Sequence, residues 1–339
     1  MTASITAYIL AIIFILGLSI YAILDGFDLG IGNSFFIFKK EERGRLMDII
    51  APFWDGNETW IVFAATLGIA AFPLTYFVML PSLYIPAIIM VVGLFMRGIS
   101  FEFRLKAQGR DKLIWDTTFF IGSFIASFFQ GVLFSSAFVG LEISNDDVYT
   151  GGALDFINPF SIVSGFLTCL IYLSLGLGFV RYKMTGNMAN KAAKIIKKII
   201  PVSFVSTFIM EFWLINSKDG LKDHFFSESY KLNTYLILSL VSFAVLVYLF
   251  RLLNKSEHNV KTFLTIVVLF SISLIKKIVI FWPFFIFPQY TILQAANPSP
   301  ALKFTFIIVC IFLPIVIFAT IFAYSTFRGK LLKSDQFYS

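Results

Sequence analysis

Residues 5–29 read ITAYILAIIFILGLSIYAILDGFDL, a run with no charged residue before Asp25. About 20 consecutive apolar residues span the hydrocarbon of a bilayer as one helix. The stretch therefore predicts a membrane-spanning helix whose last turns carry two carboxylates, Asp25 and Asp28. No positive charge precedes the apolar run, so we expect a retained helix and not a cleaved signal peptide.

The rest of the chain repeats this pattern. The sequence has 339 residues, is 58% hydrophobic and 14% charged, and has a mean hydropathy of +0.85. Such a composition is typical of a polytopic membrane protein. We expect an all-α fold, a single transmembrane domain over 1–339 with about nine spans, of which the sixth is short and interrupted by Glu211. The expected spans lie near 5–29, 53–72, 74–96, 115–140, 159–180, 199–216, 234–252, 262–287 and 303–326.

The basic residues alternate between loops. Of the 27 Lys and Arg residues, 21 follow the odd-numbered spans, whereas the loop after the fourth span is acidic, with Glu142, Asp146, Asp147 and Asp155. Because cytoplasmic loops are enriched in Lys and Arg, this places the N-terminus outside and the C-terminus in the cytoplasm. The net charge of +7 is then explained by topology and membrane lipid contact, and no nucleic-acid partner is expected.

Ionisable residues inside a bilayer are costly and usually functional or paired. Asp25 and Asp28 are three residues apart and share one helical face, as do Asp55 and Glu58 at the start of the second span. All four are predicted at the cytoplasmic edge, where they would form a proton entrance. The alternative for Asp55 and Glu58 is favourable charge at a helix N-terminus. Three residues at the end of the third span are possible charge partners of the cluster: Arg97, Glu102 and Arg104. The alternative for the two arginines is ordinary anchoring at the cytoplasmic interface.

A second group of charges lies deeper. Counted from the cytoplasmic ends of their spans, Glu211 and Lys276 fall beyond the midplane at similar depth, given a rise of about 1.5 Å per residue. We expect a buried pair of Glu211 with Lys276 or Lys277. The alternative is that the lysines extend outward to the interface and do not pair.

The chain offers few ligands for a redox metal. Its two histidines, His224 and His258, lie in predicted loops on opposite sides of the membrane. Its two cysteines, Cys169 and Cys310, lie in apolar runs, which argues against a disulfide framework or an iron–sulfur site. We therefore expect no metal bound by this chain's own side chains.

Two motifs resemble a known family. Tyr21-Ala-Ile-Leu-Asp25-Gly-Phe-Asp28-Leu-Gly30, followed by Ala51-Pro-Phe-Trp54-Asp55-Gly-Asn57-Glu-Thr-Trp60, is similar to subunit II of the cytochrome bd-type quinol oxidases. The motifs Phe101-Glu-Phe-Arg104, Trp115-Asp116 with Ile121-Gly-Ser123, and Asn158-Pro-Phe160 extend the match. The likeness is specific in the first half and weak after about residue 185.

The resemblance implies two four-helix bundles plus a peripheral helix in a bacterial cytoplasmic membrane. It also implies a partner, subunit I, that carries two b-type haems, haem d and the quinol site and reduces oxygen to water. Asp55 would then belong to a proton path from the cytoplasm, with Asp25 and Asp28 nearby. The family often has Gln at the position of Glu58, and Lys276 and Lys277 depart from a usually uncharged stretch, so no role is carried over to these three.

Two other functions remain open from sequence. A stand-alone proton-coupled transporter would use the same carboxylates, and Pro81 and Pro86 would break its third span, although no internal repeat accompanies them. A purely structural membrane partner would use every carboxylate for assembly. The sequence also leaves open which quinol is used, whether a structural quinone or lipid occupies this subunit, whether oxygen enters through it, and whether a small single-span subunit attaches.

Overall fold

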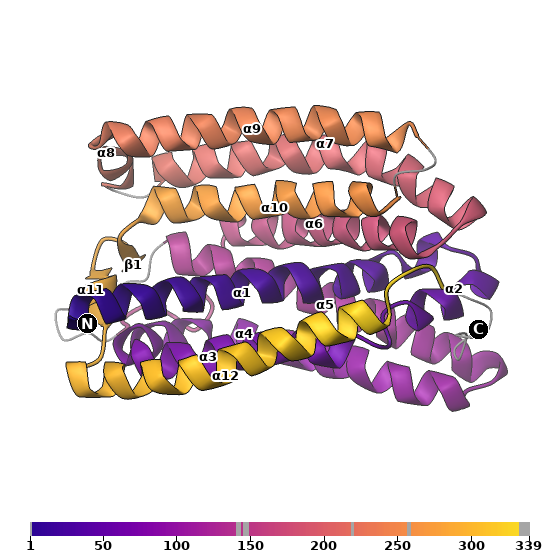
Figure 1. Ribbon diagram of the computed structural model, residues 1–339, viewed down its shortest axis with the longest axis horizontal. Coiled ribbons are helices and arrows are strands. Elements are labelled where there is room, and N and C mark those ends of the chain that lie inside the picture. The colour runs from indigo at the N-terminus through magenta and orange to yellow at the C-terminus, as the bar shows by residue number, and fades with distance from the viewer. Residues whose placement is uncertain (1, 140–143, 145–148, 218–219, 256–258, 332–339) are drawn as a thin grey trace.

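The computed structural model describes residues 2–139, 144, 149–217, 220–255 and 259–331. The predicted acidic residues Glu142, Asp146 and Asp147, and His258, lie outside the described residues. Within these ranges the chain is almost wholly helical, and the helices run lengthwise through the molecule (Figure 1).

Nine helices of the described chain have 18 or more residues, and each overlaps one predicted span. Eight of them are long and apolar enough to cross a membrane. The exception is α3, which has 18 residues and carries Asp55 and Glu58 near its start. The nine are α1 (Ala3–Asn33), α3 (Trp54–Ala71), α4 (Pro73–Lys106), α5 (Gly109–Val139), α6 (Pro159–Lys183), α7 (Gly186–Ser217), α9 (Ser229–Leu253), α10 (Asn259–Phe281) and α12 (Ser299–Thr326).

Two expectations about the helices were wrong. The sixth span is not short: α7 has 32 residues and continues past Glu211. Its basic first half is amphipathic, since it buries Met188, Ala192 and Ile196 at helical spacing, and the predicted span omitted it. The third span is not broken either, because α4 continues through Pro81 and Pro86.

Short elements connect the long helices, and the sequence did not predict them. They include an antiparallel strand pair in which Phe284 lies opposite Thr291, so the fold is not purely α-helical. The short elements are η1 (Phe35–Ile37), α2 (Lys40–Asp48), α8 (Leu221–Phe226), β1 (Phe284–Ile286), β2 (Tyr290–Thr291) and α11 (Ile292–Ala295).

The long helices form two groups of four. The first contains α1, α3, α4 and α5, and the second contains α6, α7, α9 and α10, while α12 packs mainly on α3 and α1. The two groups meet where α6 packs against α1 and α5. A Cβ atom on Gly30 would lie 1.7 Å from the Tyr172 carbonyl oxygen, so the two backbones approach closely at this glycine.

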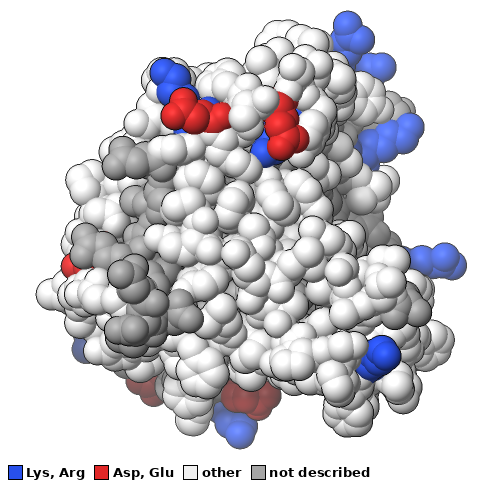
Figure 2. Space-filling model, turned by 90° about the vertical axis from the view of Figure 1, so that its left-hand side faces the viewer, with Lys and Arg blue, Asp and Glu red and all other residues white. Residues whose placement is uncertain are grey.

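The two ends of the molecule differ in charge. At the right-hand end of Figure 1, called the basic end below, α1 ends, α3 begins and α2 carries Lys40, Arg43 and Arg45. Figure 2 looks onto the opposite end, where charged side chains lie toward the rim and the middle of the described surface is white.

Candidate functional site

The basic end of the first helix group holds a buried arginine between two carboxylates. Arg97 of α4 is fully buried, and its Nη1 lies 2.5 Å from Asp25 Oδ1 of α1. Its Nη2 donates a hydrogen bond to Glu58 Oε1 of α3. The guanidinium also lies 6.0 Å from the Trp54 ring. One planar cation thus joins three helices, a geometry that suits the fork of arginine better than the single ammonium of lysine.

A second set of hydrogen-bonded side chains begins at Asp28, which lies one helical turn nearer the basic end of α1 than Asp25. Asn57 Nδ2 of α3 donates a hydrogen bond of 2.8 Å to Asp28 Oδ2, and Tyr324 of α12 donates one of 3.0 Å to Asn57 Oδ1. Asp28 is fully buried, and its Oδ1 has no hydrogen-bond partner in the described chain; the same holds for Asp25 Oδ2. Buried carboxylate oxygens without partners are the atoms on which a proton is easily held.

The polar residues continue from Asp25 toward the opposite end. Tyr21 precedes Asp25 by one helical turn and so lies on the same face of α1. Its hydroxyl accepts a hydrogen bond of 2.7 Å from Gln130 Nε2 of α5, and Tyr172 of α6 donates to Gln130 Oε1. All three residues line a cavity of about 450 Å³ that is otherwise mostly apolar. The cluster is therefore connected by polar side chains to an internal space between the helix groups.

The other predicted members of this site lie elsewhere. Asp55 is exposed in the first turn of α3, and Glu102 is exposed on α4. Arg104 does not meet the cluster: its Nε lies 2.5 Å from Asp116 Oδ1, and Arg43 approaches Asp116 Oδ2 at 3.2 Å. Of the three residues expected to neutralise the carboxylates, Arg97 alone has a described ion pair with one of them.

Sequence reasoning missed the uncharged members of the site. Asn57 lies between Asp55 and Glu58 in the quoted motif, yet a search for charges passes over it. Tyr324 lies 267 residues further along the chain, and no local pattern connects it with Asn57. Its signal would have been that it is the one tyrosine of the strongly apolar α12, just as Gln130 is the one amide side chain of α5.

The second group of charges lies within the other helix group. Lys276 Nζ of α10 lies 2.6 Å from Glu211 Oε2 of α7, and Lys277 Nζ lies 3.9 Å from Glu211 Oε1. Tyr235 of α9 donates a hydrogen bond of 2.8 Å to Glu211 Oε2. The structure thus brings Glu211 together with both lysines, closely with Lys276 and loosely with Lys277.

The described residues contain no group of three or more His, Cys, Asp or Glu side chains that could hold a metal ion. His224 lies in the short helix α8, where its Nε2 is 3.0 Å from the Trp282 carbonyl oxygen and 3.0 Å from Lys231 Nζ. Burial, together with the Lys231 charge, lowers the pKa of His224 below its ordinary value.

The fold and the two charged clusters can be compared with known proteins. The sequence model of the family described as cytochrome bd terminal oxidase subunit II matches residues 6–327. This chain belongs to that family. Family membership accounts for the two N-terminal motifs, and it disfavours the stand-alone transporter that the sequence left open.

Relatives named as subunits of cytochrome bd oxidases align with part of this chain. Cytochrome bd ubiquinol oxidase subunit 2 of Bacillus subtilis (strain 168) is 39% identical over 186 residues, which cover 54% of this chain and 55% of the relative. Cytochrome bd-I ubiquinol oxidase subunit 2 of Escherichia coli (strain K12) is 28% identical over 207 residues, or 59% of this chain and 55% of the relative. This chain thus spans somewhat more than half the length of these relatives.

A solved structure shares the whole fold. The structure of bd oxidase from Geobacillus thermodenitrificans contains a chain that superposes with a TM-score of 0.75. The superposition covers 95% of this chain and 99% of the other, at 17% sequence identity. This likeness establishes the fold and says nothing about individual side chains.

Proposed function

We propose that this chain is the haem-free subunit II of a bd-type terminal quinol:oxygen oxidoreductase in a bacterial cytoplasmic membrane. In this role it supports a haem-bearing subunit I and conducts protons from the cytoplasm toward the site of oxygen reduction. Family membership and the names of the bd oxidase relatives support the complex. The observation that carries the proton role is the buried cluster of Asp25, Asp28 and Glu58 around Arg97.

The cluster has more acids than bases. Its three carboxylates face one guanidinium, and the two aspartates are fully buried. Carboxylates that share a low-dielectric site cannot all be ionised without a large cost, so at least one of them holds a proton readily. A chain of such groups can accept a proton on one side and release it on the other.

The positions of the groups give this path a direction. Asp55 is exposed at the basic end, which we assign to the cytoplasm from the loop charges, and Asp28 is a buried carboxylate that accepts a hydrogen bond from Asn57, two residues after Asp55. Asp25 and Arg97 follow, and the Glu58 side chain is 28% exposed at the surface of this chain. We therefore place the entrance at Asp55 and Asp28 and the transfer to subunit I at Glu58.

The complex would supply the redox chemistry. Haems b and d in subunit I would pass electrons from a quinol to oxygen, and each electron delivered to oxygen requires one proton. The 450 Å³ cavity of this chain has the size and apolar lining of a small-molecule site, and it is the place where a structural quinone or a lipid would bind. A small third subunit would have to attach outside the two helix groups.

The test uses the purified complex with each carboxylate replaced by its amide. Asp28→Asn keeps the shape and one hydrogen bond from Asn57 but removes the proton-carrying group, so steady-state oxygen consumption should fall several-fold at unchanged haem absorbance. Asp55→Asn should slow turnover less, because water can reach the cluster beside it. Glu102→Gln, an exposed carboxylate on the same end, serves as the control and should have no effect.

Two results would argue against the proposal. Normal turnover with normal haem content in Asp28→Asn would exclude a proton role for this residue. Loss of haem absorbance in the same variant would instead favour the purely structural partner, in which the carboxylates serve assembly.

A further inference from the structure

The two helix groups differ in charge at the basic end of the molecule, where α7 begins and α9 ends (Figure 1). In the first group, residues 39–58 and 97–116 contain nine Lys or Arg and eight Asp or Glu. In the second group, residues 181–200 and 251–261 contain nine Lys or Arg and one acidic residue, Glu257, which lies outside the described residues. The second group therefore has a surplus of positive charge at this end.

Three exposed cations of the second group lie beside the end of α9. They are Lys194 and Lys198 of α7 and Arg251 of α9. Lys197 Nζ donates a hydrogen bond of 2.7 Å to Oδ1 of Asn254, the residue that caps α9. Because Lys194 and Lys198 lie within one turn of Lys197, and Arg251 lies one turn before Asn254, all three cations are at the level where α9 ends.

This level is that of the lipid headgroups. At a rise of about 1.5 Å per residue, the 32 residues of α7 extend about 48 Å, whereas the hydrocarbon of a bilayer is about 30 Å thick. The second half of α7 is apolar and the first half is basic, so the excess length places the first turns outside the hydrocarbon.

The three cations are not needed to cap α9. Cations near the end of a helix commonly bond its last carbonyl groups. Here Arg181 of α6 fills that role, since its Nη2 donates hydrogen bonds to the carbonyl oxygens of Leu252 and Lys255, at 3.3 and 2.6 Å. The exposed charge of Arg251 is therefore available to a ligand.

An exposed apolar stripe leads to a basic residue on each of the two helices. The stripe residues of α7, which follow Lys198 at intervals of three or four, are Val202, Val205 and Ile209. Those of α9, which precede Arg251 at the same intervals, are Leu240, Phe243 and Val247. Residues at this spacing share one face of a helix, so each stripe and its basic residue form a continuous surface.

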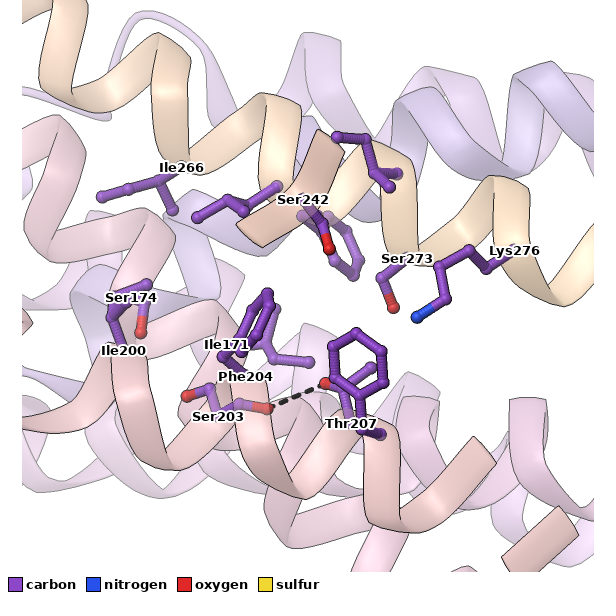
Figure 3. A pocket seen from close by; sticks show the side chains of 14 residues that line it. Ile171, Ser174, Ile200, Ser203, Phe204, Thr207, Ser242, Ile266, Ser273 and Lys276 are labelled. Atoms are coloured by element: carbon purple, nitrogen blue, oxygen red, sulfur yellow. Dashed lines mark hydrogen bonds between the residues drawn. The ribbon is translucent and has the colours of Figure 1, made fainter. Parts of the chain in front are cut away.

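The stripe of α7 faces away from the helix group. Figure 3 shows the inner face of this helix, where Ile200, Ser203 and Thr207 line a cavity of about 60 Å³ among α6, α7, α9 and α10. Val202, Val205 and Ile209 lie on the other side, and each is more than half exposed. The outer surface thus combines apolar side chains at hydrocarbon depth with cations at headgroup depth.

We propose that the outer surface of α7 and α9 binds an anionic phospholipid, whose phosphate is held by Lys194, Lys198 and Arg251. Its acyl chains lie along the apolar stripes, and its phosphate oxygens accept charge-assisted hydrogen bonds from the three cations. A zwitterionic lipid would bring a cation of its own into a surface that already has a positive surplus. A soluble anion would leave the stripes uncovered. This binding is independent of the proton role of the first helix group.

The test is native mass spectrometry of the purified complex with added cardiolipin or phosphatidylcholine. The triple variant Lys194→Gln, Lys198→Gln and Arg251→Gln should bind cardiolipin about tenfold or more weakly, given what each basic side chain contributes near an anionic lipid. Its affinity for phosphatidylcholine should change little. The matched control is Lys40→Gln, Lys106→Gln and Arg110→Gln, which removes the same charge from exposed positions of the first group and should keep the cardiolipin affinity.

Three outcomes would overturn the proposal. The first is equal cardiolipin affinity in the two triple variants, and the second is an equal loss of both lipids in the test variant. The third is unchanged lipid binding with loss of the other subunit from the complex, which would assign the surface to a protein partner. If the triple variant does not assemble, Lys198→Gln is compared with Lys106→Gln, and the expected difference in cardiolipin affinity is then about fivefold.

Discussion

The two buried charge clusters of this protein are built from opposite surpluses. Arg97 pairs with the carboxylates of Asp25 and Glu58, and a third carboxylate, Asp28, lies one helical turn from Asp25, whereas around Glu211 two ammonium groups face one carboxylate. The first cluster joins α1, α3 and α4 near the basic end, and the second joins α7 and α10 away from it. Each cluster has a buried ion pair at its centre and a less buried ion at its edge. The edge ion is Glu58 in the first cluster and Lys277 in the second.

The comparison distinguishes the residues that form ion pairs from the residues that could carry protons. In each cluster the central pair has the geometry of a structural ion pair, and removal of one partner would leave a buried charge uncompensated. The groups at the edge are less buried than the central pair, and they are the groups that can change protonation state at lower cost. The same cluster can therefore be structural at its centre and functional at its edge.

The largest expected effect is that of Arg97→Met. Asp25 and Glu58 would lose their one described cation, and breaking a buried pair in this way costs about 3–5 kcal/mol. We expect a greatly reduced yield of the assembled complex and a lower melting temperature, followed by tryptophan fluorescence. Arg43→Met is the matched control, since Asp116 keeps its contact with Arg104, and it should have little effect.

The double variant Arg97→Met with Asp25→Asn examines the cause of that effect. If the cost comes from an uncompensated carboxylate, neutralising Asp25 should restore part of the lost stability. A melting temperature of Arg97→Met equal to that of the unaltered complex would mean that the carboxylates are already protonated. In that case the paired centre described above would not exist.

The second cluster offers an internal comparison between its two lysines. Lys276→Met removes an ammonium 2.6 Å from Glu211 with a 2% exposed side chain, so we expect destabilisation of about 3–5 kcal/mol. Lys277→Met removes one at 3.9 Å with a 32% exposed side chain, and the loss should stay below about 1 kcal/mol. Thermal unfolding of both variants measures the difference, and equal losses would contradict the division into centre and edge.

The sequence predicts the charged residues of both clusters better than it predicts which residues they contact. Charges in apolar runs are rare enough that Asp25, Arg97, Glu211 and Lys276 stand out, and helical rise places Glu211 and Lys276 at the same depth. The partners of a charge are harder to predict because they depend on how helices rotate about their axes. Arg104 was therefore assigned to the carboxylates, although its side chain turns toward Asp116.

The remaining differences between prediction and structure concern uncharged side chains and helices that contain basic or proline residues. Asn57, Gln130 and Tyr324 carry no charge, so nothing in an apolar run distinguishes a hydrogen-bonded side chain from one that faces lipid. The extension of α7 back to Gly186 was missed because its first turns are basic, and hydropathy marks the membrane segment and not the helix. The prolines of α4 were read as breaks, but proline is tolerated within membrane helices when neighbouring groups satisfy the freed carbonyls.

The smallest expected effect concerns His224, a titratable ring whose Nε2 lies 3.0 Å from Lys231 Nζ. Burial and Lys231 lower the pKa of His224 in the folded chain, so the unfolded chain binds the proton more tightly. The stabilisation that the neutral ring provides is complete above its unfolded pKa of about 6.5 and is lost as the pH falls toward the lower folded value. Acidification should therefore reduce the melting temperature of the complex slightly more than in His224→Gln, which cannot be protonated. The melting temperatures of the unaltered complex and of His224→Gln could instead fall in parallel over this pH range. In that case Lys231 does not act on the His224 ring. A nearby cation would then be insufficient to shift the protonation of a group at the edge of either cluster.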